Sequence, residues 1–534
     1  MRLPCHREHS EAIQPFVDCF VAALPAMTNP MRIALYAFLV GAASAFAFAP
    51  TDLWPLLPVA FALLCELLDR TKSLWKSLLT GWAFGLGQFV VGLNWIATSF
   101  TYQAAMPPWL GWVAVVLLSL YLAIYPSIAA ALAWRFGRED RVTLVLVLAG
   151  AWILTEWLRG TMLTGFPWNP AAAALVPTPL ISITALIGTY AASGLVVLLG
   201  GAVWLEIHKK WLPLVLIIGV TGFLWLLPSS RVPSDPLTVR NVRIVQPNIG
   251  EDIKHGDTYN QEASLSLTRL SGGPSGDARL LLWPEAALTV PLEDARLGDP
   301  ALFASNLRTQ LGSLLGPNDL LLTGGTTVNS TNGIDISSLD NSVFAVAPGG
   351  VIKGRYDKAH LVPYGEYLPM RSLMSAIGIS RLAPGEFDFD SGPGPRTIDL
   401  GGEWGKVGFQ VCYEMIFSGD VVDENNRPDF IFNPSNDAWF GRWGPPQHLA
   451  QARLRAAEEG LPILRSTPTG ISAVIDARGN LVKSIPWRTA GVINAVIPAR
   501  SDGPPLFARF GNAIPLILGF LLVAGGIVLA RRRR

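Results

Sequence analysis

The sequence predicts an α-helical membrane bundle of about eight spans joined to a separate outward-facing α/β domain. Half of the 534 residues are hydrophobic and only 15% are charged, against roughly 25% charged residues in a typical soluble protein. Apolar runs long enough for a bilayer crowd the first 230 residues, whereas residues 237–505 have the composition of a soluble domain. The membrane part and the soluble part are therefore expected to fold as distinct units.

The overall charge and the cysteines exclude several classes of protein. The 41 Lys and Arg residues balance 40 Asp and Glu residues to a net charge of +1, so bulk charge gives no basis for binding nucleic acid. Four cysteines are too few and too scattered for a disulfide scaffold or a Cys-based zinc site. They are Cys5, Cys19, Cys65 and Cys412.

Seven spans are expected before residue 231, because a membrane helix needs about 20 mostly apolar residues. Residues 77–134 contain no charged side chain and are too long for one crossing, so the polar, Pro-containing residues 102–108 supply a turn. The seven ranges are 33–49, 53–68, 77–97, 109–134, 142–157, 181–205 and 211–227, and an eighth span is expected at 512–530.

Lys and Arg near the helix ends predict the orientation, since cytoplasmic loops are enriched in these residues. The expected inner segments carry fifteen of them, whereas the outer ends carry three, namely Arg159, Arg231 and Arg509. Both termini are therefore expected in the cytoplasm, with the α/β domain on the outer face of the membrane. The Arg tail at 531–534 directly follows an apolar span, which favours a role in topology over a nucleic-acid patch.

Residues 1–30 are expected to form a cytoplasmic extension that is dispensable, or that reflects an over-extended start site. They contain charges and prolines and lack the compact apolar run of a signal peptide.

The segment 237–505 alternates short β-rich runs with helical patterns, which indicates an α/β layered domain. It holds 23 Lys and Arg against 29 Asp and Glu residues. Strands are expected at 239–246, 280–283, 320–324, 342–347, 406–412, 430–433, 463–466, 472–475 and 491–497, and helices at 259–270, 300–314 and 446–459.

Three local motifs in this domain carry groups that can do chemistry. Leu-Trp-Pro-Glu places Glu285 at a strand end, residues 356–367 place Lys358 eight residues before Glu366, and Val-Cys-Tyr-Glu places Cys412 after a strand. Each has a simpler interpretation, since a strand-end cysteine is usually a small buried hydrophobe and an exposed Glu–Lys pair contributes about 0–1 kcal/mol. Cys412 is, however, the only cysteine expected outside the cytoplasm and the bundle, which favours a catalytic role over a disulfide.

Together these motifs resemble the catalytic motifs of the nitrilase (carbon-nitrogen hydrolase) superfamily, with its Glu-Lys-Cys triad. Such a domain set between seven spans and one span resembles the apolipoprotein N-acyltransferase family. Further similar segments are 155–160, 163–169, 436–441, 455–458 and 466–470. The resemblance implies an αββα sandwich, and the chain departs from it at His255, where the family commonly has an aromatic residue.

The resemblance also implies a mechanism. Cys412 would attack a membrane phospholipid with Glu285 as general base, and the acyl chain would pass through a thioester to the α-amino group of a diacylglyceryl-cysteine on an apolipoprotein. Lys358 and the backbone N–H of Tyr413 would stabilise the oxyanion. Glu366 would orient Lys358 and Glu285, or would only cap its loop, and Glu414 would be a further supporting residue.

Other candidates are weaker. Trp439 and Phe440 are candidate lid residues, although aromatic residues beside a strand are more often core. Glu156 and Arg159 are expected near the outer end of the fifth span, as an i,i+3 ion pair or a contact for a lipid headgroup. His360 and His448 are isolated in the sequence, so no metal is expected. Neither a cofactor nor a partner subunit is expected.

Two other functions remain open. A membrane-tethered amidase acting on a small amide would use the same triad, but one span would suffice as an anchor. A transporter with an outer binding domain would be expected to show polar or interrupted helices at mid-membrane, which these spans almost lack.

Overall fold

The computed structural model describes residues 30–102, 107–210, 212–226, 240–250, 259–274, 276–288, 290–372 and 387–532. The expected N-terminal extension up to residue 29, His255 and the last two arginines lie outside these residues.

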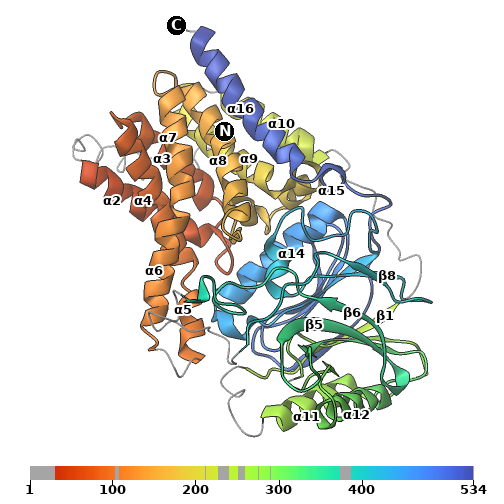
Figure 1. Ribbon diagram of the computed structural model, residues 1–534. Coiled ribbons are helices and arrows are strands. Elements are labelled where there is room, and N and C mark those ends of the chain that lie inside the picture. The colour runs from red at the N-terminus through yellow and green to blue at the C-terminus, as the bar shows by residue number, and fades with distance from the viewer. Residues whose placement is uncertain are drawn as a thin grey trace, which may run out of the picture.

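The N-terminal half is a bundle of apolar helices, and each expected span overlaps one or two of them. The last helix of the chain returns to pack along α8 and α9 (Figure 1). The helices are α2 (Pro30–Ser44), α3 (Leu56–Asp69), α4 (Leu74–Gly92), α5 (Ile96–Ser99), α6 (Leu110–Leu122), α7 (Ile124–Gly137), α8 (Arg141–Thr161), α9 (Thr184–Ile207), α10 (Leu212–Leu226) and α16 (Ala513–Arg532).

Not all of these helices have the length of a full span. Among the described residues, four are long and apolar enough to cross a bilayer: Leu110–Gly137, Arg141–Thr161, Pro179–Ile207 and Ala513–Arg532. A fifth crossing is possible if α4 and the segment Ile96–Tyr102, bent by 48°, form one broken span. The helices Met31–Ala47 and Pro213–Leu226 are shorter. The coarse architecture is as expected, and the count of eight spans stays a prediction.

The C-terminal half contains two sheets. One has the strand order β13 (Gly491–Val496), β1 (Asn241–Gln246), β2 (Leu280–Leu282), β4 (Leu320–Asn329), β5 (Ser338–Ala347) and β6 (Val351–Asp357), with β3 (Glu293–Asp294) paired to β4. The other has the order β12 (Leu481–Ile485), β11 (Ser472–Ile475), β10 (Ile463–Ser466), β9 (Phe430–Pro434), β8 (Lys406–Phe409) and β7 (Thr397–Asp399). In each sheet three strands run parallel, β1, β2 and β4 in the first and β8, β9 and β10 in the second.

The two sheets pack face to face and helices cover their outer sides. Alternating residues of β1 show this: Val242 and Ile244 share a buried core with Phe409 and Phe432 of the other sheet, whereas Val245 faces outward. Helices α11 (Tyr259–Ser271) and α12 (Asp299–Ser313) cover the first sheet, and α14 (Gly444–Glu459) covers the second (Figure 1). This is the αββα sandwich that the resemblance implies.

Helix α14 lies between the second sheet and the membrane bundle (Figure 1). Leu449, Ala452 and Ala456 pack against the sheet, whereas Leu454 and Ala457 join the core of the bundle. Because both faces of α14 are buried, this one helix joins the two halves of the molecule.

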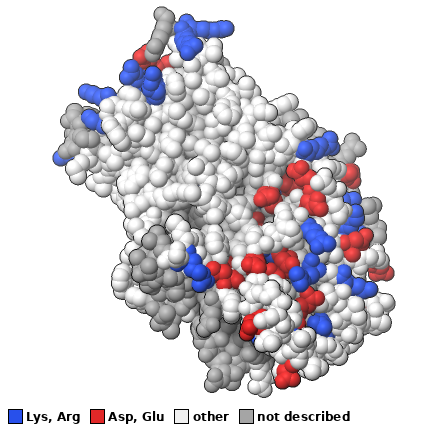
Figure 2. Space-filling view, viewed as in Figure 1, with Lys and Arg blue, Asp and Glu red and all other residues white. Residues whose placement is uncertain are grey.

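The surface of the bundle carries few charges. Figure 2 shows a broad area of uncharged residues on this half, with Lys and Arg gathered at the end far from the sandwich domain. Charged residues of both signs cover the sandwich domain.

Candidate active site

The three sequence motifs meet at one edge of the sandwich. Glu285 follows β2, Lys358 follows β6, and Cys412 opens the short 3₁₀-helix η7 (Cys412–Ile416) after β8. All three side chains are almost inaccessible to solvent, with exposed fractions of 6%, 1% and 4%. Their convergence on a buried site is what the motifs predict, and their catalytic roles are taken up below as a proposal.

Two carboxylates bind the Lys358 ammonium, and one amide joins them. Its Nζ lies 2.9 Å from Glu366 Oε1 and 3.4 Å from Glu285 Oε1. Asn341 Nδ2 donates to the same oxygen of each carboxylate, at 2.8 and 2.9 Å. The backbone N–H of Asn436 donates to Glu285 Oε2 at 2.7 Å. The Glu285 carboxylate is thereby fixed at both oxygens.

Glu366 makes the contacts that each of its two suggested roles needs. Its Oε1 binds Lys358, and its Oε2 accepts from the Val362 N–H at 2.8 Å, which closes its own loop. Asn341 was not found from the sequence, because nothing near it in the chain marks it. It binds both carboxylates, and its backbone oxygen accepts from the Lys358 N–H at 2.9 Å.

The charge on Lys358 is stabilised by its surroundings. Burial alone would lower the pKa of this lysine, but the nearby carboxylates of Glu366 and Glu285 outweigh it and raise the pKa above its ordinary value. Lys358 is therefore a permanent cation in the site, suited to stabilising an oxyanion rather than to exchanging protons.

Cys412 adopts a backbone conformation that favours glycine. Its φ is 51°, in the left-handed region that costs an ordinary residue about 1–2 kcal/mol. The preceding backbone is held on both sides: the Val411 N–H donates to Glu414 Oε2 at 2.6 Å, and Asn433 Nδ2 donates to the Gln410 carbonyl at 2.6 Å. The surrounding structure therefore holds the thiol in place against a local preference.

The thiol is buried among charges. Burial raises the pKa of Cys412 and the negative charge of Glu285 raises it further, with Lys358 acting in the opposite direction. A thiol in this state reacts as a nucleophile only if a base removes its proton, and Glu285 is the carboxylate whose charge acts on it most strongly.

Glu414 ties the lysine loop to the cysteine loop. Its Oε1 accepts from the Tyr356 hydroxyl at 2.8 Å and from the N–H groups of Ala359 and His360 at 2.7 and 3.2 Å. Its Oε2 accepts from Val411. Burial raises the pKa of Glu414 to about 7 even though these hydrogen bonds lower it. The residue holds two of the three motifs in register.

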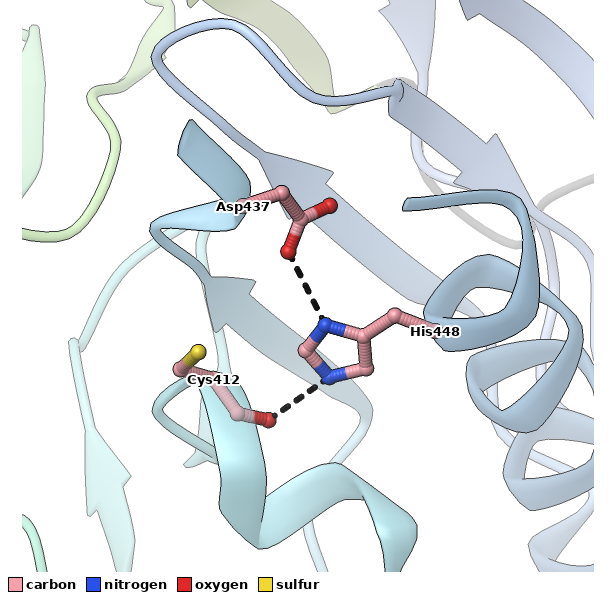
Figure 3. A group of neighbouring side chains, drawn as sticks. All are labelled: Cys412, Asp437 and His448. Carbon is pink, nitrogen blue, oxygen red and sulfur yellow. Dashed lines mark hydrogen bonds and ion pairs between the residues drawn. The ribbon is translucent and has the colours of Figure 1, made fainter. Parts of the chain in front are cut away.

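His448 is not isolated, contrary to its appearance in the sequence. From α14, its Nε2 donates to the Cys412 carbonyl at 3.0 Å and its Nδ1 pairs with Asp437 Oδ1 at 2.9 Å (Figure 3). Arg465, fully buried on β10, binds both oxygens of Asp437 at 2.8 and 2.7 Å. Burial and the positive charge of Arg465 lower the pKa of His448. Burial would raise the pKa of Asp437, but Arg465 and His448 outweigh this effect and lower it.

Cys412, Asp437 and His448 are residues of the kinds that bind metal ions, and they lie close together. Ligand atoms of Cys412, Asp437 and His448 lie within 4.8 Å of one another. Both ring nitrogens of His448 are already engaged, one by a backbone carbonyl and one by Asp437. The Arg465 guanidinium already supplies the positive charge at this place, since its Nη2 lies 3.1 Å from His448 Nδ1 and binds both oxygens of Asp437. The arrangement therefore fits a hydrogen-bonded network and does not fit a metal centre.

A loop of the bundle forms the floor beneath the nucleophile. Tyr413, next to Cys412, donates its hydroxyl to the Gly165 carbonyl at 2.9 Å, and His360 Nε2 donates to the Thr164 carbonyl at 2.8 Å. The site is therefore assembled from the sandwich domain and from the loop that follows α8.

Glu156 and Arg159, both on α8, hold this loop in place. Both side chains are buried, with exposed fractions of 5% and 3%, and their closest charged atoms are 3.6 Å apart. Arg159 Nη1 donates to the carbonyls of Phe166 and Trp168 at 2.9 and 2.8 Å. The sequence suggested a pair at the membrane surface, whereas the pair lies inside the bundle and is occupied by the loop, which favours support over headgroup contact.

The candidate lid residues Trp439 and Phe440 are half-buried where the sandwich domain meets the bundle. The rings of Trp439 and Tyr102 meet edge to face, and so do those of Phe440 and Trp95. Ser99 donates to the Trp439 carbonyl at 3.0 Å. The segment is held by the α5 region of the bundle.

Two further residues of α14, Gln447 and Glu458, make polar contacts with the bundle. Gln447 accepts from the Trp168 indole N–H at 2.8 Å and donates to the Gly92 carbonyl at 3.2 Å. At the other end of the helix, Glu458 Oε1 accepts from the Thr189 N–H at 2.5 Å. That N–H follows a kink in α9 at Gly188, where φ is 75° and a Cβ atom would lie 2.3 Å from the Phe507 ring.

A buried Glu-Lys-Cys cluster at the edge of an αββα sandwich defines a protein of the carbon-nitrogen hydrolase superfamily. Residues 241–501 match the family model described as carbon-nitrogen hydrolase, and residues 40–202 match the one described as apolipoprotein N-acyltransferase N-terminal domain.

Similarity to known proteins extends over nearly the whole chain. The apolipoprotein N-acyltransferases of Rhodopseudomonas palustris and Caulobacter vibrioides are each 35% identical to it. These alignments cover 94% and 93% of this chain and 95% and 94% of the relatives. The chain belongs to the apolipoprotein N-acyltransferase family, as its motifs and arrangement predict.

Proposed function

We propose that this enzyme transfers an acyl chain from a membrane phospholipid, through a thioester on Cys412, to the α-amino group of the diacylglyceryl-cysteine at the N-terminus of apolipoproteins. One observation carries the proposal: the Glu285–Lys358–Cys412 cluster lies directly where the sandwich meets the bundle loop at Thr164 and Gly165. A site in this place receives lipid-anchored donors and acceptors without extracting them into water.

In the first half-reaction Glu285 takes the proton of the Cys412 thiol, and the sulfur attacks the ester carbonyl of the phospholipid. The oxyanion of the tetrahedral intermediate is stabilised by the Lys358 ammonium and by the Tyr413 backbone N–H. The C–O bond then breaks, Glu285 returns the proton to the departing lysophospholipid, and the acyl chain remains on Cys412.

In the second half-reaction the free amine of the diacylglyceryl-cysteine attacks the thioester carbonyl. Glu285 accepts a proton from the amine and passes it to the sulfur as the C–S bond breaks, which leaves an amide and a free thiol. Glu366 and Asn341 keep Lys358 and Glu285 in place throughout, and Trp439 and Phe440 shield the acyl chain. Exclusion of water protects the thioester from hydrolysis. These steps need neither a metal nor a cofactor.

The proposed location is the bacterial inner membrane, with a seven-span bundle at residues 31–230, a periplasmic catalytic domain at 237–505, an eighth helix at 512–530 and cytoplasmic termini. The uncharged surface of the bundle and the basic end far from the sandwich support this orientation (Figure 2). No described residue requires a partner subunit for the site, so the enzyme is proposed to act as a monomer.

The decisive experiment is mass spectrometry of the purified protein after incubation with phospholipid alone. An acyl adduct is expected on Cys412 and should disappear when a diacylglyceryl lipopeptide is added. Cys412→Ala should form no adduct, and Cys412→Ser should be nearly inactive because Glu285 is a weak base for a hydroxyl. Normal acyl transfer by Cys412→Ala would eliminate the covalent mechanism.

A small amide in a parallel incubation tests the alternative of a membrane-tethered amidase. The bundle provides the floor of the site as well as an anchor, which favours a lipid substrate. Turnover of the amide without a lipid adduct would reverse this preference.

A further inference from the structure

The residue that follows Gln447 on α14 reaches the nucleophile itself. His448 is completely buried, and its Nε2 lies 3.0 Å from the carbonyl oxygen of Cys412 (Figure 3). A carbonyl oxygen only accepts, so the imidazole carries a proton on Nε2 and donates it to this oxygen.

The position of that carbonyl matters because Cys412 has a φ of 51°. A residue in the left-handed region is held there by its surroundings, since other conformations are locally preferred. The backbone before Cys412 is held by Glu414 and Asn433. The hydrogen bond from His448 holds the carbonyl group, on the other side of the Cys412 α-carbon, and so fixes the ψ angle of Cys412. With the backbone fixed on both sides, the direction of the Cys412 side chain is fixed as well.

The imidazole is itself held from a sheet. Arg465 on β10 binds Asp437 with two hydrogen bonds and also binds Ser435 at 2.9 Å and Asn433. Asp437 Oδ1 and Arg465 Nη2 lie 2.9 and 3.1 Å from His448 Nδ1. The ring cannot turn without breaking this network, so a rigid chain of contacts runs from the sheet to the Cys412 carbonyl.

We propose that His448 is a positioning residue of the acyl-transfer reaction, which holds the backbone of Cys412 so that the thiol faces Glu285 and the acyl donor. It transfers no proton and touches no substrate. The inference rests on the proposed function, because its effect is on formation of the Cys412 thioester.

Three variants on one helix test this role. His448→Leu removes the donor, and His448→Gln retains an amide that can donate to the Cys412 carbonyl. Gln451→Leu is the matched control: Gln451 is also buried on α14, with an exposed fraction of 1%, and neither atom of its amide has a hydrogen-bond partner in the described structure. All three are to be purified as the full chain, with melting temperatures recorded.

The rate of thioester formation is measured in a single turnover with phospholipid vesicles, together with KM and kcat. His448→Leu should slow acylation by about 10²-fold, the loss expected when a reacting group is misplaced by about 1 Å, with KM unchanged. His448→Gln should recover part of the rate, and Gln451→Leu should react as the wild type does.

A wild-type rate in His448→Leu would overturn the inference, and so would equal losses in the Leu and Gln variants when both melt as the control does. If His448→Leu does not fold, His448→Gln decides: a lowered kcat at unchanged KM supports the role, and a loss carried by KM overturns it. Failure of the wild type to form a thioester would instead refute the proposed function.

Discussion

The Lys358 ammonium is held more closely by Glu366 than by Glu285, at 2.9 Å against 3.4 Å. Glu366 therefore competes for the lysine with Glu285, the proposed general base. In the proposed mechanism, Glu366 partly satisfies the charge of Lys358 and leaves the Glu285 carboxylate able to accept the proton of the thiol.

Replacing Glu366 by Gln should remove this competition. Lys358 would then pair fully with Glu285, which weakens Glu285 as a base, and the rate of thioester formation should fall by about 10²-fold, the low end of what acid–base catalysis contributes. KM for phospholipid should stay near the wild-type value. The measurement is single-turnover acylation, with Glu403→Gln, on the surface of the same domain, as control. An unchanged rate would show that Glu366 only caps its loop.

Helix α14 should stabilise the whole molecule through Gln447. Gln447→Leu leaves the Trp168 indole N–H and the Gly92 carbonyl without their partner, and each buried polar group left unpaired costs about 1–3 kcal/mol. The melting temperature in detergent should fall clearly. Gln310→Leu, an exposed glutamine on α12, should melt with the wild type, and equal melting of both variants would argue against a tight junction.

Glu414 should contribute stability that is lost as the pH rises from about 4.5 to 7, against an opposite contribution from His448, whose pKa is lowered by burial and by Arg465. Its pKa is raised by burial to about 7 from the ordinary value of 4.5. Between these values the folded state holds a proton that the unfolded state has released, so raising the pH favours unfolding, by at most about 3 kcal/mol. Asp437, whose pKa is lowered, stays ionised in both states over this range and adds no slope.

Melting temperatures measured across this pH range test the effect of Glu414. Glu414→Gln should be less stable throughout, since an amide cannot accept from all four donors, but the gap between its melting temperature and that of the wild type should narrow as the pH rises. The exposed Glu424→Gln should keep the wild-type slope. Parallel curves for wild type and Glu414→Gln would contradict the assignment.

The orientation can be tested with two introduced cysteines. Thr331→Cys lies on an exposed loop of the sandwich, and Glu139→Cys lies on the exposed turn between α7 and α8. A membrane-impermeant thiol reagent applied to intact cells should label the first, whereas the second should react only after lysis. The reverse pattern would place the catalytic domain in the cytoplasm.

Much of this architecture could be predicted because short stretches of the sequence carry the hydrophobic pattern of the helix or strand that they form. Buried strands such as β1, β2 and β9 read as short apolar runs, and the helices of the bundle read as apolar stretches. The sequence does not predict strands β6 and β12 because they lie at sheet edges, where each of Val351–Asp357 and Leu481–Ile485 has only one buried side chain. A strand without a buried face leaves no hydrophobic pattern.

The residues of the candidate site also fall into those that the sequence predicts and those that it does not. Glu285, Lys358 and Cys412 each sit in a motif that ends a strand, so sequence reasoning finds them. Asn341 and His448 do not, because their partners come from other elements: His448 on α14 meets residues that precede it by 11 and 36 positions. Only the fold brings such residues together.

The hydrogen bond between the Thr189 N–H and the Glu458 carboxylate joins residues 269 positions apart. Ribosomes make the chain from its N-terminus. Helix α9 therefore reaches the bilayer long before Glu458, the residue that accepts from the Thr189 N–H, has been made. Unpaired backbone groups are costly where water is scarce. The final packing of this helix therefore waits until the later half of the chain has been made, folded and docked, so the membrane part is completed late in the folding of the enzyme.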